Sequence, residues 1–537
     1  MPKYYNIKKV CIRMKEIIKR IYYFLLSPFT ENSFFFAVLA FLVSIADVIA
    51  WVIYGDPVFA IYLGLHGFIM SYAIALIVSA IKNAKFKKIL KAFILVLAFI
   101  NFCVDAAIHM ACKIGFTNDM VAIVMGTNIS ESKEFLGTYI SLGYVVVVAI
   151  VCVLLYILCK IKKYIVLWER KIAPLLLVLV FLSSVVIFAR KSENWDGIFI
   201  NKVVSFLKYK SPPDLRSYYT HPCVTQTDET IPDNLLIIIG ESFKRNHSSL
   251  YGYEMCTNPL LTQLKEDSLL FVYDNVVSPT TSTIKTFQAI MSLYNTEDGD
   301  KVNWYECTTL MEILTLAGYN TLWISNQSPT GIHDNIVTKY AELCDSVIWT
   351  GSKYKGIAKK DYDGQVVDIL DSLIKQNVRF ANGYKNVIII HLMGSHYIFN
   401  ERYPQEFEVF HAEQYPRYEK NKAEIISDYD NSILYNDFVV SEILNRFADK
   451  SMLAFYFSDH GIDLYESSND YFGHALLNNQ KSIEVSRQIP FVVYCSPALQ
   501  SQCPDIKDTL DSIIIDSYNT DNLIQLVTDV MGIEVIQ

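Results

Sequence analysis

The stretch from Asn234 to Tyr253 reads NLLIIIGESFKRNHSSLYGY, and it decides the fold of the second half of the chain. The aliphatic run Leu235–Ile239 has the length and β-branching of a strand that is buried on both faces of a parallel sheet. The run ends at Gly240 and the carboxylate of Glu241. Ligands gather beyond the carboxyl ends of parallel strands. We therefore expect Glu241 to lie where a metal or substrate is held, although an isolated Gly-Glu-Ser is more often only the first polar turn after a strand.

Alternating apolar runs and helical stretches continue from this strand to the C-terminus. Such alternation predicts an α/β domain in which a largely parallel sheet is covered by helices on both faces. The expected strands are Leu235–Ile239, Leu269–Tyr273, Thr321–Ile324, Val387–Leu392, Leu453–Ser458 and Pro490–Tyr494. The expected helices are Thr283–Ser292, Thr309–Leu316, Tyr362–Lys375, Glu424–Phe447 and Asp521–Val530.

The first 190 residues hold most of the apolar excess of a 537-residue chain that is 52% hydrophobic. Several segments there reach about 20 residues, the length that crosses a bilayer. Lysine and arginine cluster before the first segment, between the second and third, and between the fourth and fifth. By the positive-inside rule these clusters are cytoplasmic, so the C-terminal half lies on the other side of the membrane. The five expected spans are about Ser33–Tyr54, Pro57–Ile81, Ala92–Met110, Tyr139–Leu158 and Ala173–Ala189.

These patterns divide the chain into a five-span transmembrane domain over 1–190, a linker over 191–230 and an exported domain over 231–537. Six cysteines follow residue 190, an even number in a compartment where disulfides persist. Cys495 and Cys503 are close enough in sequence to pair across a loop, whereas the others could equally be reduced core thiols. The net charge of −8 offers no basic surface for nucleic acid.

Two further segments carry groups suited to metal or phosphate chemistry. AFYFSDHG places Asp459 and His460 together beyond an apolar strand. SPTTSTIKT, from Ser278 to Thr286, brings several hydroxyls to the start of a helix, where free N–H groups favour an anion. Alone, such a stretch is more often an ordinary helix cap. Glu, Asp and His around a hydroxyl make a zinc site with an open position, and the metal would make a threonine nucleophilic.

Histidines in two other segments, HLMGSHYIFNERYP and YFGHA, could bind a second metal, contact phosphate oxygens or protonate a leaving group. They are His391, His396 and His474, and any one of them alone is more often structural. The loop over 111–137, expected outside the cytoplasm, suits a short helix lying on the membrane surface. Thr127 and Glu131, four residues apart, would share one face of that helix.

Taken in this order and behind five spans, these motifs resemble the phosphoethanolamine transferases of bacterial envelopes. That group includes lipid A modifying and colistin-resistance enzymes and belongs to the alkaline phosphatase and sulfatase superfamily. The resemblance therefore implies a sulfatase-like fold for the C-terminal α/β domain. The motifs that carry it are GES and LYGY within 240–253, SPTTSTIKT, WISNQ at 323–327, HLMGSHYIFNERYP at 391–404, YDNSILYND at 429–437, SDHG and the later histidine.

The resemblance implies a zinc ion held by Glu241, Thr283, Asp459 and His460, with Thr283 as the nucleophile. The family nucleophile is the second threonine of a Thr-x-Thr-x-x-Ser pattern, which this chain reproduces with threonine in the last position. Thr281 is the first fallback and Thr280 the second. The implied substrate-binding residues are His396 and His474 on the phosphate side, Thr127 and Glu131 near the lipid headgroup, and Ser328 or His333 in place of a family lysine.

The implied activity is transfer of phosphoethanolamine from phosphatidylethanolamine to lipopolysaccharide core, lipid A or another envelope acceptor, through a covalent phospho-threonine. The enzyme would be a multi-pass protein of the bacterial inner membrane with a periplasmic catalytic domain. Pro279 and Thr280 stand where the colistin-resistance branch has cysteine and glycine, so lipid A itself is not assigned.

Two alternatives remain open. Lipoteichoic acid synthases transfer phosphoglycerol with the same layout, but the HxMGSHxxF motif resembles the phosphoethanolamine group more. A non-catalytic membrane protein that keeps the fold would be expected to lose a metal ligand, and all four positions are present.

Overall fold

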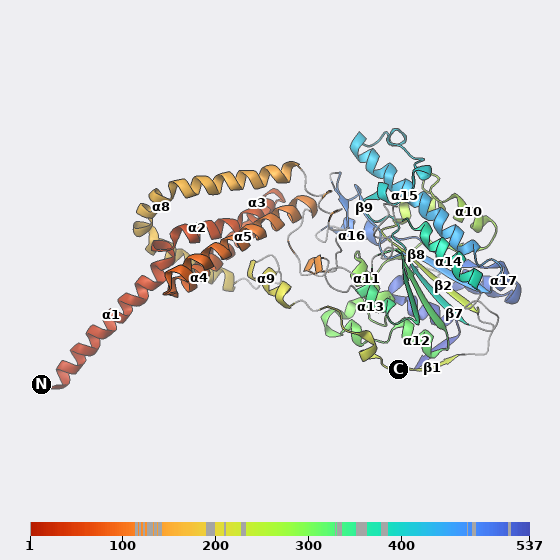
Figure 1. Ribbon diagram of the computed structural model, residues 1–537, viewed down its shortest axis with the longest axis horizontal. Helices are drawn as coiled ribbons and strands as arrows, with labels where there is room; N and C mark the ends of the chain where they lie inside the picture. Colours follow the sequence, from red (N-terminus) through yellow and green to blue (C-terminus); the bar gives the residue numbers. More distant parts are fainter. Residues whose placement is uncertain are drawn as a thin grey trace. The chain divides into compact units, whose positions relative to one another are not determined.

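The computed structural model divides the chain into two compact units, an N-terminal helical unit that ends at Lys210 and a C-terminal unit that comprises mainly Ser211–Gln537 (Figure 1). The structure describes all residues except 1, 113–115, 117–119, 122–123, 126–132, 134–136, 138–141, 190–198, 209–210, 227–231, 328, 330–335, 351–361, 377–384, 470, 475–478, 514–516 and 537.

Among its described residues, the N-terminal unit holds four helical segments that are long and apolar enough to cross a membrane, which are Ser33–Ile53, Pro57–Ala80, Ala84–Met110 and Leu142–Ile161. A shorter apolar segment, Ile172–Val185, coincides with the fifth predicted span. The predicted apolar helical domain is thus confirmed, with four of the five predicted spans long enough to cross a membrane and a shorter apolar segment at the place of the fifth. Its described helices are α1 (Pro2–Thr30), α2 (Ser33–Leu42), α3 (Ile45–Ile53), α4 (Pro57–Ala80), α5 (Ala84–Cys112), α8 (Leu142–Ala189) and α9 (Phe199–Lys208).

A seven-stranded sheet forms the centre of the C-terminal unit, in the order β3-β11-β8-β2-β7-β5-β6. β11 runs antiparallel to both of its neighbours, and the other pairs within this sheet are parallel. All six predicted strands are present, whereas the short edge strand β6 was not predicted. The strands are β2 (Asn234–Gly240), β3 (Leu270–Val272), β5 (Asn320–Ser325), β6 (Ser346–Trp349), β7 (Asn386–His391), β8 (Met452–Ser458) and β11 (Phe491–Cys495).

The central strand β2 is fully buried because helices cover both faces of the sheet. Leu235, Ile237 and Ile239 join one core cluster, and Leu236 and Ile238 join the other, as the two-residue period of a strand requires. The first cluster takes in α11 (Thr283–Ile290), α12 (Leu310–Leu316), α13 (Ile336–Ala341) and α19 (Leu523–Val530). The second takes in α10 (Pro259–Glu266), α14 (Gly364–Gln376) and α15 (Lys420–Asn445).

Part of the expected linker belongs to the C-terminal unit. β1 (Cys223–Gln226) pairs antiparallel with β13 (Ile533–Ile536). Val224 of β1 and Ile533 and Val535 of β13 pack against the first core cluster. The segment before residue 231 is therefore not wholly a connector. Cys495 and Cys503 are free thiols, so they do not form the disulfide that their spacing allowed.

Candidate active site

Two carboxylates emerge side by side because β2 and β8 are adjacent parallel strands in register. Gly240 lies opposite Ser458, and the chain then continues into Glu241 on one strand and Asp459 on the other. The Asp459 N–H donates to the Gly240 carbonyl at 3.0 Å, which extends the pairing by one residue. The sheet therefore fixes both side chains at its carboxyl edge, where ligands bind in folds of this kind.

Glu241, Asp459 and His460 form a fully buried group whose ligand atoms all lie within 4.8 Å of one another. His460 Nε2 lies 3.4 Å from Glu241 Oε1 and 3.5 Å from Asp459 Oδ2. The other ring nitrogen, Nδ1, lies 2.8 Å from the Gly461 carbonyl. Because that carbonyl can only accept, Nδ1 carries a hydrogen and Nε2 faces the carboxylates.

Neighbouring groups hold the two carboxylates in place. The Ser242 hydroxyl donates to Glu241 Oε1 at 2.7 Å, and the backbone N–H of His460 donates to Asp459 Oδ1 at 2.7 Å. Burial, together with the nearby charge of Asp459, raises the pKa of Glu241. Burial alone would lower the pKa of His460, but the two carboxylates more than offset it, so that pKa is raised. Both shifts show that negative charge is crowded here and that a cation would be favoured.

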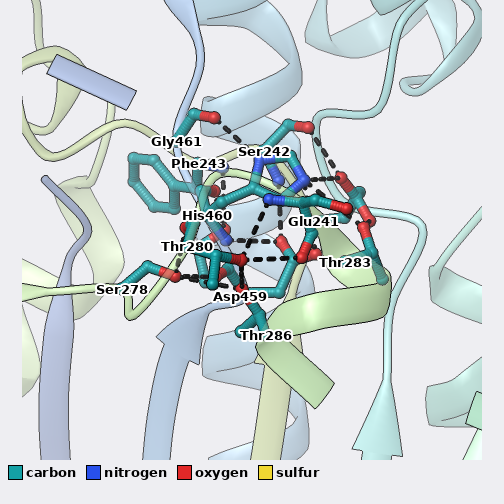
Figure 2. A network of polar contacts seen from close by, with 12 residues as sticks. Glu241, Ser242, Phe243, Ser278, Thr280, Thr283, Thr286, Asp459, His460 and Gly461 are labelled. Carbon is teal, nitrogen blue, oxygen red and sulfur yellow. Dashed lines mark hydrogen bonds and ion pairs between the residues drawn. The ribbon is translucent and has the colours of Figure 1, made fainter. Parts of the chain in front are cut away.

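Thr283 completes the group from the first turn of α11 (Figure 2). Its hydroxyl donates to Glu241 Oε2 at 3.2 Å and lies 3.3 Å from His460 Nε2. The neighbouring Thr280 hydroxyl turns away, to the Thr286 hydroxyl at 2.9 Å. Ser278 supports this turn by donating to the Asp459 carbonyl at 2.5 Å. Of these hydroxyls, that of Thr283 therefore contacts the carboxylate and imidazole group directly.

The donor set fits a zinc ion. Two carboxylates, one imidazole nitrogen and a hydroxyl converge, a combination of oxygen and nitrogen ligands that zinc accepts. Asp459 Oδ2 is buried and has no hydrogen-bond partner, which costs free energy unless a cation or solvent satisfies it. Glu241, Thr283, Asp459 and His460 are the four residues that could hold the ion.

The three predicted histidines lie in different surroundings. The ring of His474 packs against that of His460 with centroids 5.0 Å apart. His396 is half-buried, and its buried Nδ1 has no hydrogen-bond partner. Desolvation lowers the pKa of His396, although the charge of Glu241 opposes this shift. His391, at the end of β7, is instead a core residue whose ring packs on Phe287 and Trp323, and burial lowers its pKa to about 3. Of the other predicted substrate-binding residues, Thr127, Glu131, Ser328 and His333 lie outside the described part of the chain.

Sequence reasoning missed a buried carboxylate that holds the loop before His396. Asp363 accepts the N–H of Met393 and the N–H of Gly394, each at 2.8 Å, and the side-chain amide of Asn326 at 2.8 Å. Gly394 has φ +52°, in the left-handed region, and it lies so close to the backbone of Glu241 that a side chain at this position would have no room.

The next residue in this loop completes the connection to the site. The Ser395 N–H donates to the Glu241 carbonyl at 2.9 Å. Asp363 thus positions a loop that packs directly on a candidate metal ligand. The YDG sequence around it carried no separate signal, because the residues it holds are about 30 positions away.

Comparisons with known proteins give a consistent picture. The model of the sulfatase family matches residues 233–533, more than half of the chain. Phosphoethanolamine transferase EptC of Escherichia coli (strain RS218) is 29% identical over 309 residues, 56% of this chain and 51% of EptC. Phosphoethanolamine transferase EptA of Helicobacter pylori is 30% identical over 269 residues, 49% of this chain and 47% of EptA. The chain thus spans about half the length of the curated relatives it matches.

Two solved structures are similar to this chain, one over the C-terminal domain and one over nearly the whole length. The zinc complex of the periplasmic domain of Escherichia coli EptC has a TM-score of 0.52 and 27% identity, and covers 58% of this chain and 86% of its own. The integral membrane protein EptA of Neisseria meningitidis has a TM-score of 0.65 and 19% identity, and covers 93% of this chain and 95% of its own. The second likeness confirms the predicted fold, a membrane domain followed by a sulfatase-like domain. The predicted resemblance to phosphoethanolamine transferases is likewise confirmed, and the chain belongs to the sulfatase family.

Proposed function

We propose that this protein transfers phosphoethanolamine from phosphatidylethanolamine to an envelope acceptor, with Thr283 as the nucleophile. The observation that carries the proposal is the contact of the Thr283 hydroxyl with both Glu241 and His460, at the carboxyl edge of the two central strands. The names of the relatives, phosphoethanolamine transferases, support the choice of the transferred group.

In the first step the Thr283 oxygen forms a bond to the donor phosphorus, and the bond from phosphorus to the diacylglycerol oxygen breaks. The hydroxyl points its hydrogen at Glu241 Oε2, so this carboxylate takes the proton as the Thr283 oxygen bonds to phosphorus. The diacylglycerol oxygen takes up a proton as it leaves, and His396 and His474 are the candidates to deliver it. Burial lowers the pKa of both, that of His474 to about 3, so each would relay the proton through a neutral imidazole. The product of this step is phosphoethanolamine esterified to Thr283.

In the second step an acceptor hydroxyl or phosphate oxygen attacks the same phosphorus, and the Thr283 oxygen leaves. The acceptor proton passes to the histidine that served the first step, and the Thr283 oxygen takes its proton back from Glu241 as it leaves, so the enzyme returns to its starting state. Bound at Glu241, Thr283, Asp459 and His460, a zinc ion would lower the pKa of the Thr283 hydroxyl and stabilise charge on the phosphoryl oxygens. The start of α11 supports the same charge, because the first N–H groups of a helix have no partner within it.

The relatives and the apolar helices support a proposal for the acceptor class and the location. One relative, from Escherichia coli, is named Kdo(2)-lipid A phosphoethanolamine 7''-transferase, and the membrane-bound EptA is a lipooligosaccharide phosphoethanolamine transferase. We therefore propose lipopolysaccharide or another envelope glycolipid as the acceptor class, and an inner-membrane protein whose catalytic domain is periplasmic. Thr127, Glu131 and Ser328 remain the proposed contacts to substrate.

Peptide mass spectrometry tests donor, nucleophile and transferred group together. The full-length protein in detergent is incubated with zinc and either phosphatidylethanolamine or phosphatidylglycerol, and the peptide that contains Ser278–Lys285 is examined. We expect a phosphoethanolamine adduct on Thr283, and none in a Thr283→Ala variant. An adduct on Thr281 or Thr280 would move the nucleophile, and a phosphoglycerol adduct would assign the chain to the lipoteichoic acid synthase type. A zinc-loaded sample that forms no adduct with either lipid would refute the proposal.

A further inference from the structure

The N-terminal unit contains a buried cluster of charged side chains that takes no part in the chemistry above. Asp47 lies on α3, Asp105 and His109 lie on α5, and Lys202 lies on α9. Each of these residues is at most 7% exposed. The first three lie within segments that are apolar enough to cross a membrane. Ionisable side chains in such segments are costly, so their presence calls for a specific purpose.

Lys202 is the cation that joins the two carboxylates. Its Nζ donates to Asp105 Oδ1 at 2.5 Å and lies 3.8 Å from Asp47 Oδ2. The ring of Phe116 covers the same ammonium at 5.5 Å, and this ring also packs against Phe206 further along α9. The ammonium is therefore held on one side by charge and covered on another by an aromatic face, which is a favourable setting for a desolvated cation.

Other side chains hold the two carboxylates in turn. Asp105 accepts the amide of Asn101, one turn earlier on α5, at 2.7 Å. Asp47 Oδ1 lies 2.7 Å from His109 Nε2, and the Tyr54 hydroxyl donates to the His109 carbonyl at 2.9 Å. On α5 the positions 101, 105 and 109 are four apart and so lie on one face. The cluster thus links α3, α5 and α9, because carboxylates from α3 and α5 together bind one lysine from α9.

Stability alone does not account for this arrangement. Buried ion pairs often add less to stability than well-packed apolar side chains of the same volume, whereas they do favour one geometry over its neighbours. Beyond Lys202, the C-terminal end of α9 carries Leu207, which is 80% exposed. An amphipathic helix held only by apolar contacts could slide or rotate at a membrane surface.

We propose that the seating of Lys202 between Asp47 and Asp105 locks α9 to the membrane helices in one register. α9 ends at Lys208, and the C-terminal unit begins three residues later at Ser211. The lock therefore fixes the point from which the chain leaves the membrane domain, and Lys202 acts as a positioning residue. The effect of this lock on turnover rests on the proposed function, because that function uses a lipid donor whose headgroup stays at the membrane surface.

Hydrogen exchange tests the lock independently of any activity. The full-length protein in lipid nanodiscs is compared as wild type, as Lys202→Met and as the matched control Lys208→Met, which changes an exposed lysine on the same helix. We expect faster amide exchange in the 199–208 peptide of Lys202→Met only. The charge-swapped double variant, Lys202→Asp with Asp105→Lys, should restore slow exchange. Equal exchange in wild type and Lys202→Met would overturn the proposal.

Turnover then separates positioning from a general loss of folding. Each variant is assayed with long-chain phosphatidylethanolamine in vesicles and with a short-chain, water-soluble phosphatidylethanolamine. For Lys202→Met we expect transfer from the vesicle donor to fall by at least about tenfold, since small misplacements are costly to catalysis. Cleavage of the soluble donor should stay within about twofold of wild type. Equal losses with both donors would overturn the positioning role. If wild type cleaves neither donor, the proposed function fails while the exchange result still decides the lock.

Discussion

Substituting Gly394 by alanine should displace Glu241 and weaken zinc binding. A Cβ at position 394 would lie 2.7 Å from the Glu241 nitrogen and 2.8 Å from its oxygen, both backbone atoms that cannot swing aside. The left-handed backbone, φ +52°, costs about 1–2 kcal/mol for a residue with a Cβ. Overpacking adds about 1–3 kcal/mol. The substitution should therefore lower the free energy of unfolding by ~2–5 kcal/mol. Of the two contributions, only the overpacking acts on the candidate metal ligand.

Gly252→Ala is the matched control. Gly252 also has a left-handed backbone, φ +88°, but a Cβ there would meet nothing within 4 Å. Both variants therefore bear the free-energy cost of a Cβ in the left-handed region. The difference in zinc affinity and stability between them reports the steric clash with the Glu241 backbone. We expect Gly394→Ala to lose about 10–100-fold in zinc affinity, as when other partners of metal ligands are disturbed. Gly252→Ala should bind zinc as wild type does.

Zinc affinity is measured by competition with a chromogenic chelator, and stability by the thermal unfolding midpoint with and without zinc. Gly394→Ala should show the lower midpoint of the two variants and the smaller rise on adding zinc. The reasoning is refuted if the two variants bind zinc equally tightly and unfold at the same temperature.

Three further predictions concern the same domain. Asp363→Asn places an amide N–H₂ group against a backbone N–H of the loop that packs on Glu241, so one hydrogen bond of that loop is lost. Zinc affinity in the chelator competition should then fall by about 10–100-fold. An affinity equal to that of wild type would contradict the positioning role of Asp363. Burial raises the pKa of the Asp437 carboxyl from its usual 3.8 to about 7. Between these two pH values the carboxyl keeps its proton in the folded state and has lost it in the unfolded state. The unfolding midpoint of wild type relative to Asp437→Asn should therefore fall as pH rises from about 4 to 7, and a constant difference would contradict this. Removing zinc with a chelator should lower the unfolding midpoint of wild type, because Glu241 and Asp459 then face each other unpaired, but should leave that of Asp459→Asn nearly unchanged.

The strands were predictable because burial on both faces leaves a uniform apolar run in the sequence. Leu235–Ile239 was expected as a strand, and the structure extends it by one residue at each end, to Asn234–Gly240. Ser346–Trp349 was missed because four half-buried residues at a sheet edge carry no such run. The strand order follows from contacts between distant segments, which no local pattern encodes.

The candidate site was predictable in its residue types more than in its geometry. Glu241, Asp459 and His460 follow apolar strands directly, so their place at the sheet edge could be inferred from the sequence. The choice among threonines depended on family spacing, because the direction of each hydroxyl is set by the turn that precedes α11. His391 is instead the last residue of β7, and its ring faces the core, since one residue of register decides which side a strand-end side chain takes. The role of Thr283 as nucleophile stays a prediction.

The site draws its groups from two parts of the domain that differ in rigidity. Glu241 and Asp459 continue from the two central strands, the part of a sheet that opens last in thermal fluctuations. His396 and His474 lie on loops, which tolerate sequence change far better than central strands do. If the proposed phosphoryl transfer is correct, evolution can remodel the loops for a different acceptor while the strand ends stay the same. One scaffold of this kind is suited to give rise to a set of enzymes that share a donor and differ in the molecule they modify.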